Sequence, residues 1–437
     1  MEIPAKMYPI TRSLLRTAAL ISVLAIIPAA TVVMKLKTDR LSGDGPSYVD
    51  IAQAVASGKG FQEPHGLWPG HPTVRRPPLW PIVLSLPLKL WSAKSPQSVM
   101  YATEVVLHAV TVFGAALLAW MLSGSWRRML AASLIVGLWP GAQPYLVAGL
   151  SEPCSAAVVT IGTVLVCLGP RYFFCGVAVL SLAPLVRPNF MILPMWVAAI
   201  LVIARAWRRL DLKLIGRPRR LIAAATLFFV PFAVWLTRNY VVTGSFPVVL
   251  TKVGEDIYGT YNILTATVGS PYFARWVPAD LIPGEERQRS LAARMSELEL
   301  SRYYEAKGHR FIAGHWKAIP ALLVGRVLYA AAPQWPPFGD TPTAANWSGV
   351  YRSLEWICRL ALYGTAIVLL WRRSLRLDTW YGLILTSTAL TTATTVLLYY
   401  GWERFLYQLT VLLVPLVCSA GANSRAFTKP QQTAPQG

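Results

Sequence analysis

The feature that most constrains this chain is a series of separate apolar runs, each about 16 to 24 residues long. A helix of that length crosses the hydrocarbon core of a bilayer. Hydrophobic residues make up 54% of the 437 residues and charged residues only 14%, and the mean hydropathy is +0.45. These values exclude an ordinary soluble protein. We therefore predict an all-α polytopic membrane protein, because spans of this length satisfy their backbone as helices.

About ten spans are predicted, within a range of about 8 to 12. Two further apolar stretches, 77–91 and 316–335, are proline-broken or carry the internal Arg326, and we expect them to be juxtamembrane or re-entrant helices on the outer side. The predicted spans are roughly 14–34, 98–122, 129–148, 154–168, 172–187, 190–206, 220–238, 353–371, 379–399 and 404–421.

Positive charge orients these spans. The connectors "SWRR", "RAWRRLDLKLIGRPRR" and "WRRSLR" (Arg372, Arg373 and Arg376) are strongly basic, which predicts a cytoplasmic location for them and for both termini. The longest connectors then lie outside. We divide the chain into a transmembrane catalytic module 1–238 with the first outer loop 35–97, an outer loop 239–352, transmembrane helices 353–421 and a disordered tail 422–437. The second loop contains an amphipathic helix over about residues 285–316.

The net charge of +21 does not indicate nucleic acid, because many arginines and lysines stand at helix ends and none alternates with aromatics on a soluble domain. The five cysteines have no metal-ligand spacing. The first apolar run lacks a convincing cleavage site, so we expect it to be an anchor.

An acid opens the first outer loop in "SGDGPSYVD". Gly43 and Gly45 free the backbone around Asp44, and Pro46 begins a short helix that carries Tyr48 on one face. Asp44 either caps this helix or acts in chemistry, and the pattern leaves both open.

A second acid, Glu152 in "LSEP", falls at the outer end of the third span. It either caps the next span or shares a metal ion or a reacting hydroxyl with Asp44.

Two adjacent arginines, Arg75 and Arg76, precede the diproline in "TVRRPPLWP". At the outer surface of a membrane they could bind a lipid phosphate in bidentate fashion, and ordinary headgroup anchoring is the alternative.

Three more arginines stand at outer helix ends, against the positive-inside bias. Arg187 and Arg238 are each followed closely by an asparagine, Asn189 and Asn239, and Arg404 lies in "GWERFLYQL". Together they predict a pocket for a phosphate or pyrophosphate. Snorkelling explains any one of them alone.

These motifs, taken in order, resemble a known group of membrane enzymes. "GDGPSYVDIAQAVASGKGF" with "RRPPLWP", then "LSEP", "LVRPN", "WLTRNYVVTGSFPVV" with "GEDIYGTYN", and "ERFLYQLTVLLVP" are similar to the pattern of GT-C superfamily glycosyltransferases. The resemblance covers about residues 15–420. It is to bacterial relatives of the dolichyl-phosphate-mannose protein mannosyltransferases (family 39) and to lipid A aminoarabinose transferase-like proteins.

The resemblance implies a GT-C fold and an inverting transfer of a sugar, a hexose or pentose, from a polyprenyl-phosphate donor to an acceptor hydroxyl. The acceptor would be a glycolipid, a polysaccharide or a protein. The protein would lie in the inner membrane, with its active site on the periplasmic side. Asp44 matches the family's first-loop acid, a general base or metal ligand. Arg187, Arg238 and Arg404 would neutralise the leaving phosphate.

Two departures leave metal dependence open. Gly45 stands where many relatives have a second acid, and Glu152 stands where others have Asp. No cofactor is required by the pattern, and a divalent Mg, Mn or Zn ion on Asp44 and Glu152 is the alternative. The competing functions are an envelope polysaccharide polymerase or ligase with a diphosphate-linked donor, and a transporter of lipid-linked glycans.

Overall fold

The computed structural model describes residues 8–36, 41, 43–206, 218–246, 248–332, 342–371 and 379–420. The expected disordered tail 422–437, Arg372, Arg373 and Arg376 lie outside the described residues, as does most of the basic connector between Arg205 and Arg220.

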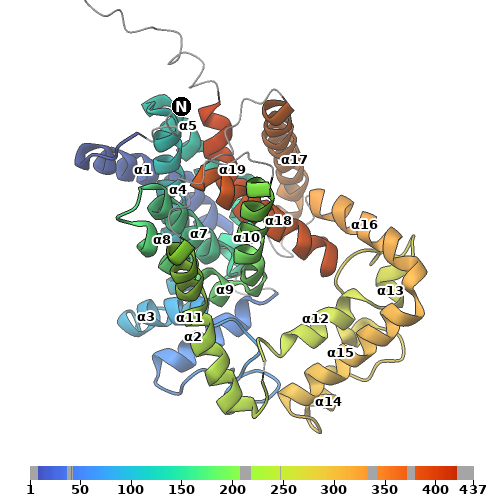
Figure 1. Ribbon diagram of the computed structural model, residues 1–437. Coiled ribbons are helices and arrows are strands. Elements are labelled where there is room, and N and C mark those ends of the chain that lie inside the picture. Colours follow the sequence, from blue (N-terminus) through green and yellow to red (C-terminus); the bar gives the residue numbers. More distant parts are fainter. Residues whose placement is uncertain are drawn as a thin grey trace, which may run out of the picture.

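Within these residues the chain is built from helices, and its one β-type contact is an isolated bridge between Gln62 and Pro72 (Figure 1). The predicted all-α class is confirmed. The principal helices are α1 (Arg12–Leu36), α2 (Gly45–Ala56), α3 (Leu79–Leu90), α4 (Pro96–Ser123), α5 (Trp126–Gly137), α6 (Gln143–Ala148), α7 (Glu152–Cys167), α8 (Phe173–Leu180), α9 (Ala183–Val186), η2 (Pro188–Ile192), α10 (Leu193–Ala206), α11 (Pro218–Thr243), α12 (Lys252–Thr260), α13 (Ile263–Ala266), α14 (Gln288–Ala292), α15 (Glu297–Gly314), α16 (Ile319–Ala331), α17 (Pro342–Trp371), α18 (Trp380–Leu398), η6 (Glu403–Leu406) and α19 (Tyr407–Ser419).

Five described helices are long and apolar enough to cross a membrane, or up to 7 if each of two bent pairs is one span. Several predicted spans correspond to bent or short helices instead of straight ones. The 129–148 segment is α5 plus α6, bent by 46°, and the spans near 154–168, 172–187 and 190–206 are apolar helices of 10–17 residues. Proline, as at Pro140 and Pro188, accounts for some of these breaks, because it removes a backbone donor.

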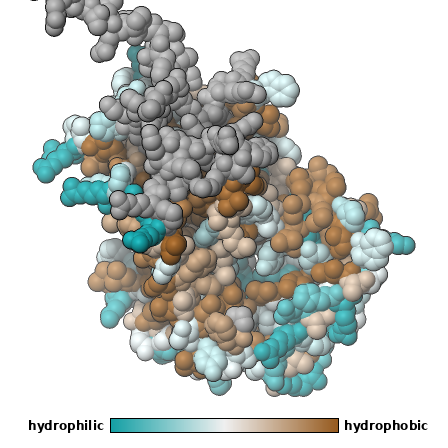
Figure 2. Space-filling view, viewed as in Figure 1, coloured by the Kyte–Doolittle hydropathy of each residue, from teal (hydrophilic) through white to brown (hydrophobic). Residues whose placement is uncertain are grey.

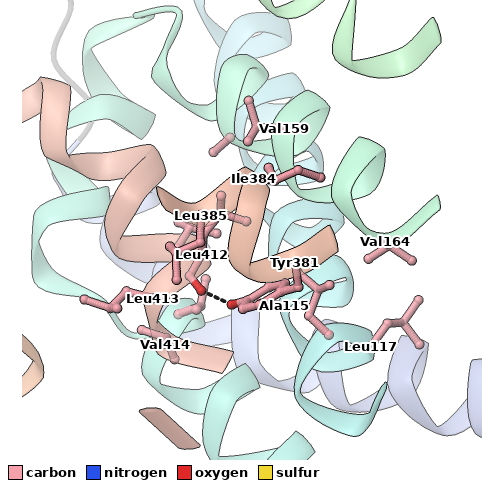
Figure 3. Close-up of a cluster of buried hydrophobic side chains, with 14 of the residues drawn as sticks. Ala115, Leu117, Val159, Val164, Tyr381, Ile384, Leu385, Leu412, Leu413 and Val414 are labelled. Carbon is pink, nitrogen blue, oxygen red and sulfur yellow. Dashed lines mark hydrogen bonds between the residues drawn. The ribbon is translucent and has the colours of Figure 1, made fainter. Parts of the chain in front are cut away.

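The core of the bundle lies around α4, which packs against α1, α5, α7 and α19. Buried residues such as Leu118, Met121 and Leu412 fill this core. Figure 3 shows how α18 is joined to it: the Tyr381 hydroxyl donates a hydrogen bond to the Leu412 carbonyl of α19.

The outer helices expose apolar side chains. Of the membrane-length stretch in α11 only 11% is buried, and of that in α17 only 22%. In Figure 2 much of the coloured surface over the helices is brown and apolar, whereas teal polar surface gathers at the lower right, over α14 and α15. An apolar exterior of this extent requires lipid as its solvent. The chain is a multi-pass membrane protein.

One end of the bundle, which we call the loop face, carries α2, α3 and α12–α15, whereas α16 packs beside α18 (Figure 1). Helices α2 and α3 are fixed there because Tyr48, Trp80 and Leu84 are buried against α4. The amphipathic helix expected over about residues 285–316 is shorter than predicted, because α14 and a turn occupy its first part. Helix α15 begins at a capping box of Ser296 and Glu299 and packs against α12.

Glu297, in the first turn of α15, ties the two long loops together. Its carboxylate accepts hydrogen bonds from the Thr73 hydroxyl at 2.9 Å, from the Val74 amide at 2.8 Å and from the Thr251 hydroxyl. Thr73 lies just before the two adjacent arginines, and Thr251 lies just before α12. One carboxylate therefore sets the position of both segments that bring cations to the loop face.

Candidate active site

A cavity of about 450 Å³ opens at the loop face, where the ends of the apolar helices meet α2 and α12. Its wall joins segments far apart in the sequence. Among the described residues, five cations and two carboxylates line it: Arg75, Arg76, Arg187, Lys252, Arg404, Asp44 and Asp256. Tyr48 and Asn189 also line it.

Asp44 is held in the cavity wall by the turn that precedes α2. Gly43 adopts a left-handed φ of 62°, and Gly45 lies so close to α6 that an added Cβ would be 2.1 Å from the Ala148 carbonyl oxygen. The Asp44 side chain makes no capping hydrogen bond. Asp44 therefore stands at the N-cap position of α2 without capping the helix through its side chain, and its role in chemistry remains a prediction.

Two guanidinium groups contact the Asp44 carboxylate. Arg76 Nη1 is 2.7 Å from Oδ1 and Arg404 Nη1 is 3.4 Å from Oδ2, and Arg76 is also held by the Ser47 hydroxyl at 3.0 Å. Burial alone would raise the pKa of Asp44, but the charges of Arg76, Lys252 and Arg404 outweigh it and hold the pKa well below its usual range. The carboxylate form of Asp44 is thus favoured, and it forms ion pairs with two arginines.

Glu152 lies behind the cavity wall and is fully buried. It forms an ion pair with Arg187 Nη1, and Arg404 Nε is 3.5 Å from the same oxygen. Arg404 therefore bridges the two acids that the sequence singled out, Asp44 and Glu152. The network holds Arg187 and Arg404 with their guanidinium groups at the cavity.

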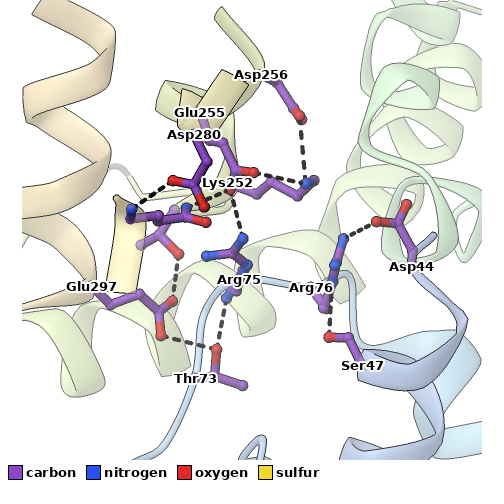
Figure 4. A network of polar contacts seen from close by, with 12 residues as sticks. Asp44, Ser47, Thr73, Arg75, Arg76, Lys252, Glu255, Asp256, Asp280 and Glu297 are labelled. Carbon is purple, nitrogen blue, oxygen red and sulfur yellow. Dashed lines mark hydrogen bonds and ion pairs between the residues drawn. The ribbon is translucent and has the colours of Figure 1, made fainter. Parts of the chain in front are cut away.

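The second loop contributes its own ion pairs. Arg75 Nη2 is 2.6 Å from Glu255 Oε2, and Lys252 Nζ is 3.6 Å from Glu255 Oε1 and 3.8 Å from Asp256 Oδ1 (Figure 4). Burial acts to raise the pKa of Glu255, but Lys252 and Arg75 lower it to about 2. Sequence reasoning missed Lys252, Glu255 and Asp256. Their i,i+3 and i,i+4 spacing in "TKVGEDIYG" was the available signal.

Two predicted phosphate-pocket residues lie outside the cavity. Arg238 donates to the carbonyls of Thr73 at 2.7 Å and Phe61 at 3.3 Å. Asn239 is fully buried and donates to the Val248 and Val249 carbonyls, each at 3.0 Å. Both side chains hold loop backbone in place, so the structure brings Arg187 and Arg404 to the cavity but not Arg238 or Asn239.

Asp44 and Glu152 do not fit a divalent ion shared between them. The guanidinium of Arg404 contacts both acids, and an ion would have to displace it. No group of three or more His, Cys, Asp or Glu side chains with metal-binding geometry occurs in the described part of the chain.

No protein-family model matches the sequence, and a search of curated proteins gives no match. Two solved structures are similar to the chain. One is ArnT from Cupriavidus metallidurans bound to undecaprenyl phosphate, with a TM-score of 0.43 and 12% identity over 93% of this chain and 78% of that chain. The other is the archaeal oligosaccharyltransferase AglB from Archaeoglobus fulgidus in complex with an inhibitory peptide and a dolichol-phosphate. It has a TM-score of 0.43 and 15% identity over 93% of this chain and 49% of that chain.

Proposed function

We propose that this chain is a membrane glycosyltransferase that moves a sugar from a polyprenyl-phosphate donor to an acceptor hydroxyl. The observation that carries the proposal is the cavity at the loop face, with Arg75, Arg76, Arg187, Lys252 and Arg404 in its wall. The order of the sequence motifs supports the same class of enzyme.

The cationic wall suits a phosphate. Guanidinium groups recognise phosphate oxygens through paired hydrogen bonds. Arg76 and Arg404 are already oriented by Asp44, and Arg187 by Glu152. The guanidinium groups are therefore already ordered before a phosphate binds, so that binding costs little further side-chain entropy. This favours both binding and catalysis.

The remaining wall suits a polyprenyl chain. Pro188, Met191 and Ile192 of η2 face the cavity together with Thr394 and Leu398 near the end of α18. These segments continue into apolar helices. A donor with a charged head and an apolar tail is therefore matched by both parts of the wall.

The reaction is an inverting displacement. The acceptor oxygen attacks the anomeric carbon and forms the new glycosidic bond, while the bond from that carbon to the phosphate oxygen breaks. Polyprenyl phosphate leaves with the extra negative charge, which Arg76, Arg187 and Arg404 stabilise. Asp44 positions the arginines in this scheme.

The loop face is the outer, periplasmic face of the inner membrane in this proposal. Helix α4 runs from the loop face to the opposite end of the bundle, where Arg127 and Arg128 open α5. Basic residues at that end favour a cytoplasmic location for it. The donor is then lipid-linked, because nucleotide sugars are cytoplasmic.

The test is transfer of labelled sugar from polyprenyl-phosphate donors by wild-type and variant protein in membranes, with mass spectrometry of the modified glycolipids, polysaccharides and proteins. Asp44→Asn is expected to abolish most transfer while the protein remains folded. Asp50→Asn is the matched control, because within the described residues the polar partner of the Asp50 carboxylate is the exposed His65, at 3.1 Å. Unchanged transfer by folded Asp44→Asn would remove the site from the reaction. Transfer from diphosphate-linked oligosaccharides alone would indicate a polymerase or ligase.

A further inference from the structure

The reaction needs a group that takes the proton of the acceptor hydroxyl, and Asp44 is poorly suited to it. Both of its oxygens contact guanidinium groups, and its pKa lies far below that of a useful base at neutral pH. Glu152 is fully buried behind the wall and paired with arginine. A proton acceptor has to be sought among the other groups that line the cavity.

Asp256 is the second carboxylate in the wall. Its nearest charged partner is Lys252 Nζ, at 3.8 Å from Oδ1, which is longer than a normal hydrogen bond. The side chain is 23% exposed, against 18% for Asp44. Asp256 thus presents carboxylate oxygens to the cavity that are not held by an arginine.

Helix packing explains why Asp256 faces the cavity. Gly254 faces α15 so closely that an added Cβ would be 1.9 Å from the Ser301 carbonyl oxygen. Two residues on, a helix has turned by roughly 200°, which directs Asp256 to the side opposite α15. Lys252, four residues before Asp256, lies on the same side. Figure 4 shows Asp256 pointing toward the Lys252 ammonium.

We propose that Asp256 is the catalytic base of the transfer reaction and accepts the proton of the acceptor hydroxyl. This assignment rests on the proposed function. The acceptor O–H bond breaks and its proton passes to a carboxylate oxygen of Asp256, while the acceptor oxygen forms the bond to the anomeric carbon. The phosphate oxygen leaves with the electron pair of the broken bond. The proton then passes from Asp256 to water, and no further reactant is needed.

The electrostatic surroundings favour this role. The charged and titratable groups that act on Asp256 are Lys252 and Glu255 on its own helix, Arg76 from the first loop and Asp44 beside α2, with Tyr399 and Tyr400 at the end of α18. Burial raises the pKa of Asp256 to about 6, and the charges of Glu255 and Asp44 act in the same direction, against Lys252 and Arg76. A carboxylate in this range accepts protons better than an ordinary Asp and is still ionised at neutral pH.

The experiment compares Asp256→Asn, Asp256→Glu and the control Asp50→Asn in purified, lipid-reconstituted protein, with kcat, the donor KM and the pH profile as readouts. Asp256→Asn is expected to lower kcat by about 100-fold or more and to change the donor KM by less than about threefold. Asp256→Glu should restore part of kcat. Wild-type kcat should rise with pH through about 6, and the residual activity of Asp256→Asn should not follow this rise.

Three outcomes overturn the assignment. If Asp256→Asn keeps the kcat of the wild type, Asp256 takes no part in the chemical step. If its donor KM rises while kcat is unchanged, Asp256 is a binding residue. A pH profile that is the same in Asp256→Asn and wild type excludes it as the titrating base. In each case wild-type transfer continues and the proposed function stands. Absence of transfer by the wild type from every polyprenyl-phosphate sugar overturns the proposed function and this assignment together.

Discussion

Arg404 Nη1 lies 3.4 Å from Asp44 Oδ2, although 360 positions separate the two residues in the chain. The same guanidinium contacts Glu152 through Nε at 3.5 Å. One side chain from the last part of the chain therefore joins the acid of the first loop to the acid at the start of α7, and it closes the cavity wall.

Arg404→Lys is expected to lower sugar transfer by at least about tenfold. A single ammonium cannot replace the planar guanidinium that contacts two carboxylates, and the loss of one charge-assisted hydrogen bond costs about 1.5–3 kcal/mol. The measurement is kcat/KM for the donor. A lysine variant with wild-type kcat/KM would show that bridging is unimportant and that charge alone suffices.

Arg187→Ala is expected to destabilise the protein by about 3–5 kcal/mol, because it leaves the fully buried Glu152 without its closest partner. The double variant Glu152→Gln with Arg187→Met should unfold in detergent at a higher thermal midpoint than Arg187→Ala. It should not regain transfer activity. Recovery of activity with stability would mean that the pair serves folding only.

Gly45→Ala is expected to lower both stability and transfer. The added Cβ would be 2.1 Å from a backbone oxygen, that of Ala148, so the turn that holds Asp44 must shift, at a cost of about 1–3 kcal/mol. Gly364→Ala in α17 is the matched control, since nothing lies within 4 Å of its added Cβ. Equal thermal midpoints and activities for the two variants would contradict the close approach of α2 and α6.

Asp256→Asn is expected to stabilise the protein at pH 8 while it lowers activity. The pKa of Asp256 in the folded protein is raised from 3.8 to about 6. The folded state therefore holds the proton of Asp256 more tightly than the unfolded state does. The stabilisation that comes from protonated Asp256 is fully present below pH 3.8 and is lost as the pH rises through about 6. Replacing the charged carboxylate by an amide should therefore raise the free energy of unfolding by about 1–3 kcal/mol above pH 6. The thermal midpoints of wild type and variant, measured at pH 4 and pH 8, should differ more at pH 8. A variant less stable than wild type at pH 8 would contradict the raised pKa.

The fold class and part of the site follow from local sequence. Apolar run length predicts membrane helices, and the turn around Asp44 with the nearby Arg76 predicts an acid and a cation at one surface. The direction of each side chain does not follow, because it depends on contacts made after folding. Arg238 and Arg187 have similar sequence contexts, yet Arg238 turns to the carbonyls of Thr73 and Phe61.

Lys252 and Asp256 were not predicted because their place at the cavity depends on the packing of α12 against α15 through Gly254. Nothing in the sequence near residue 254 specifies which helix will pack there. The short and bent helices were also not predicted, since a hydropathy pattern does not distinguish a straight crossing from two helices joined at a proline.

We propose above all that the cavity binds the phosphate of a polyprenyl-phosphate donor. The most direct measurement is native mass spectrometry of the purified protein titrated with a short-chain polyprenyl phosphate and, separately, with the corresponding polyprenol. We predict saturable binding of one polyprenyl phosphate, at least about tenfold tighter than the polyprenol. Arg76→Gln should weaken it by a similar factor, whereas Arg310→Gln, whose exposed side chain donates to the Ala306 carbonyl of its own helix, should leave it within about twofold. Equal binding of phosphate and alcohol, or equal loss in the two variants, would contradict the account.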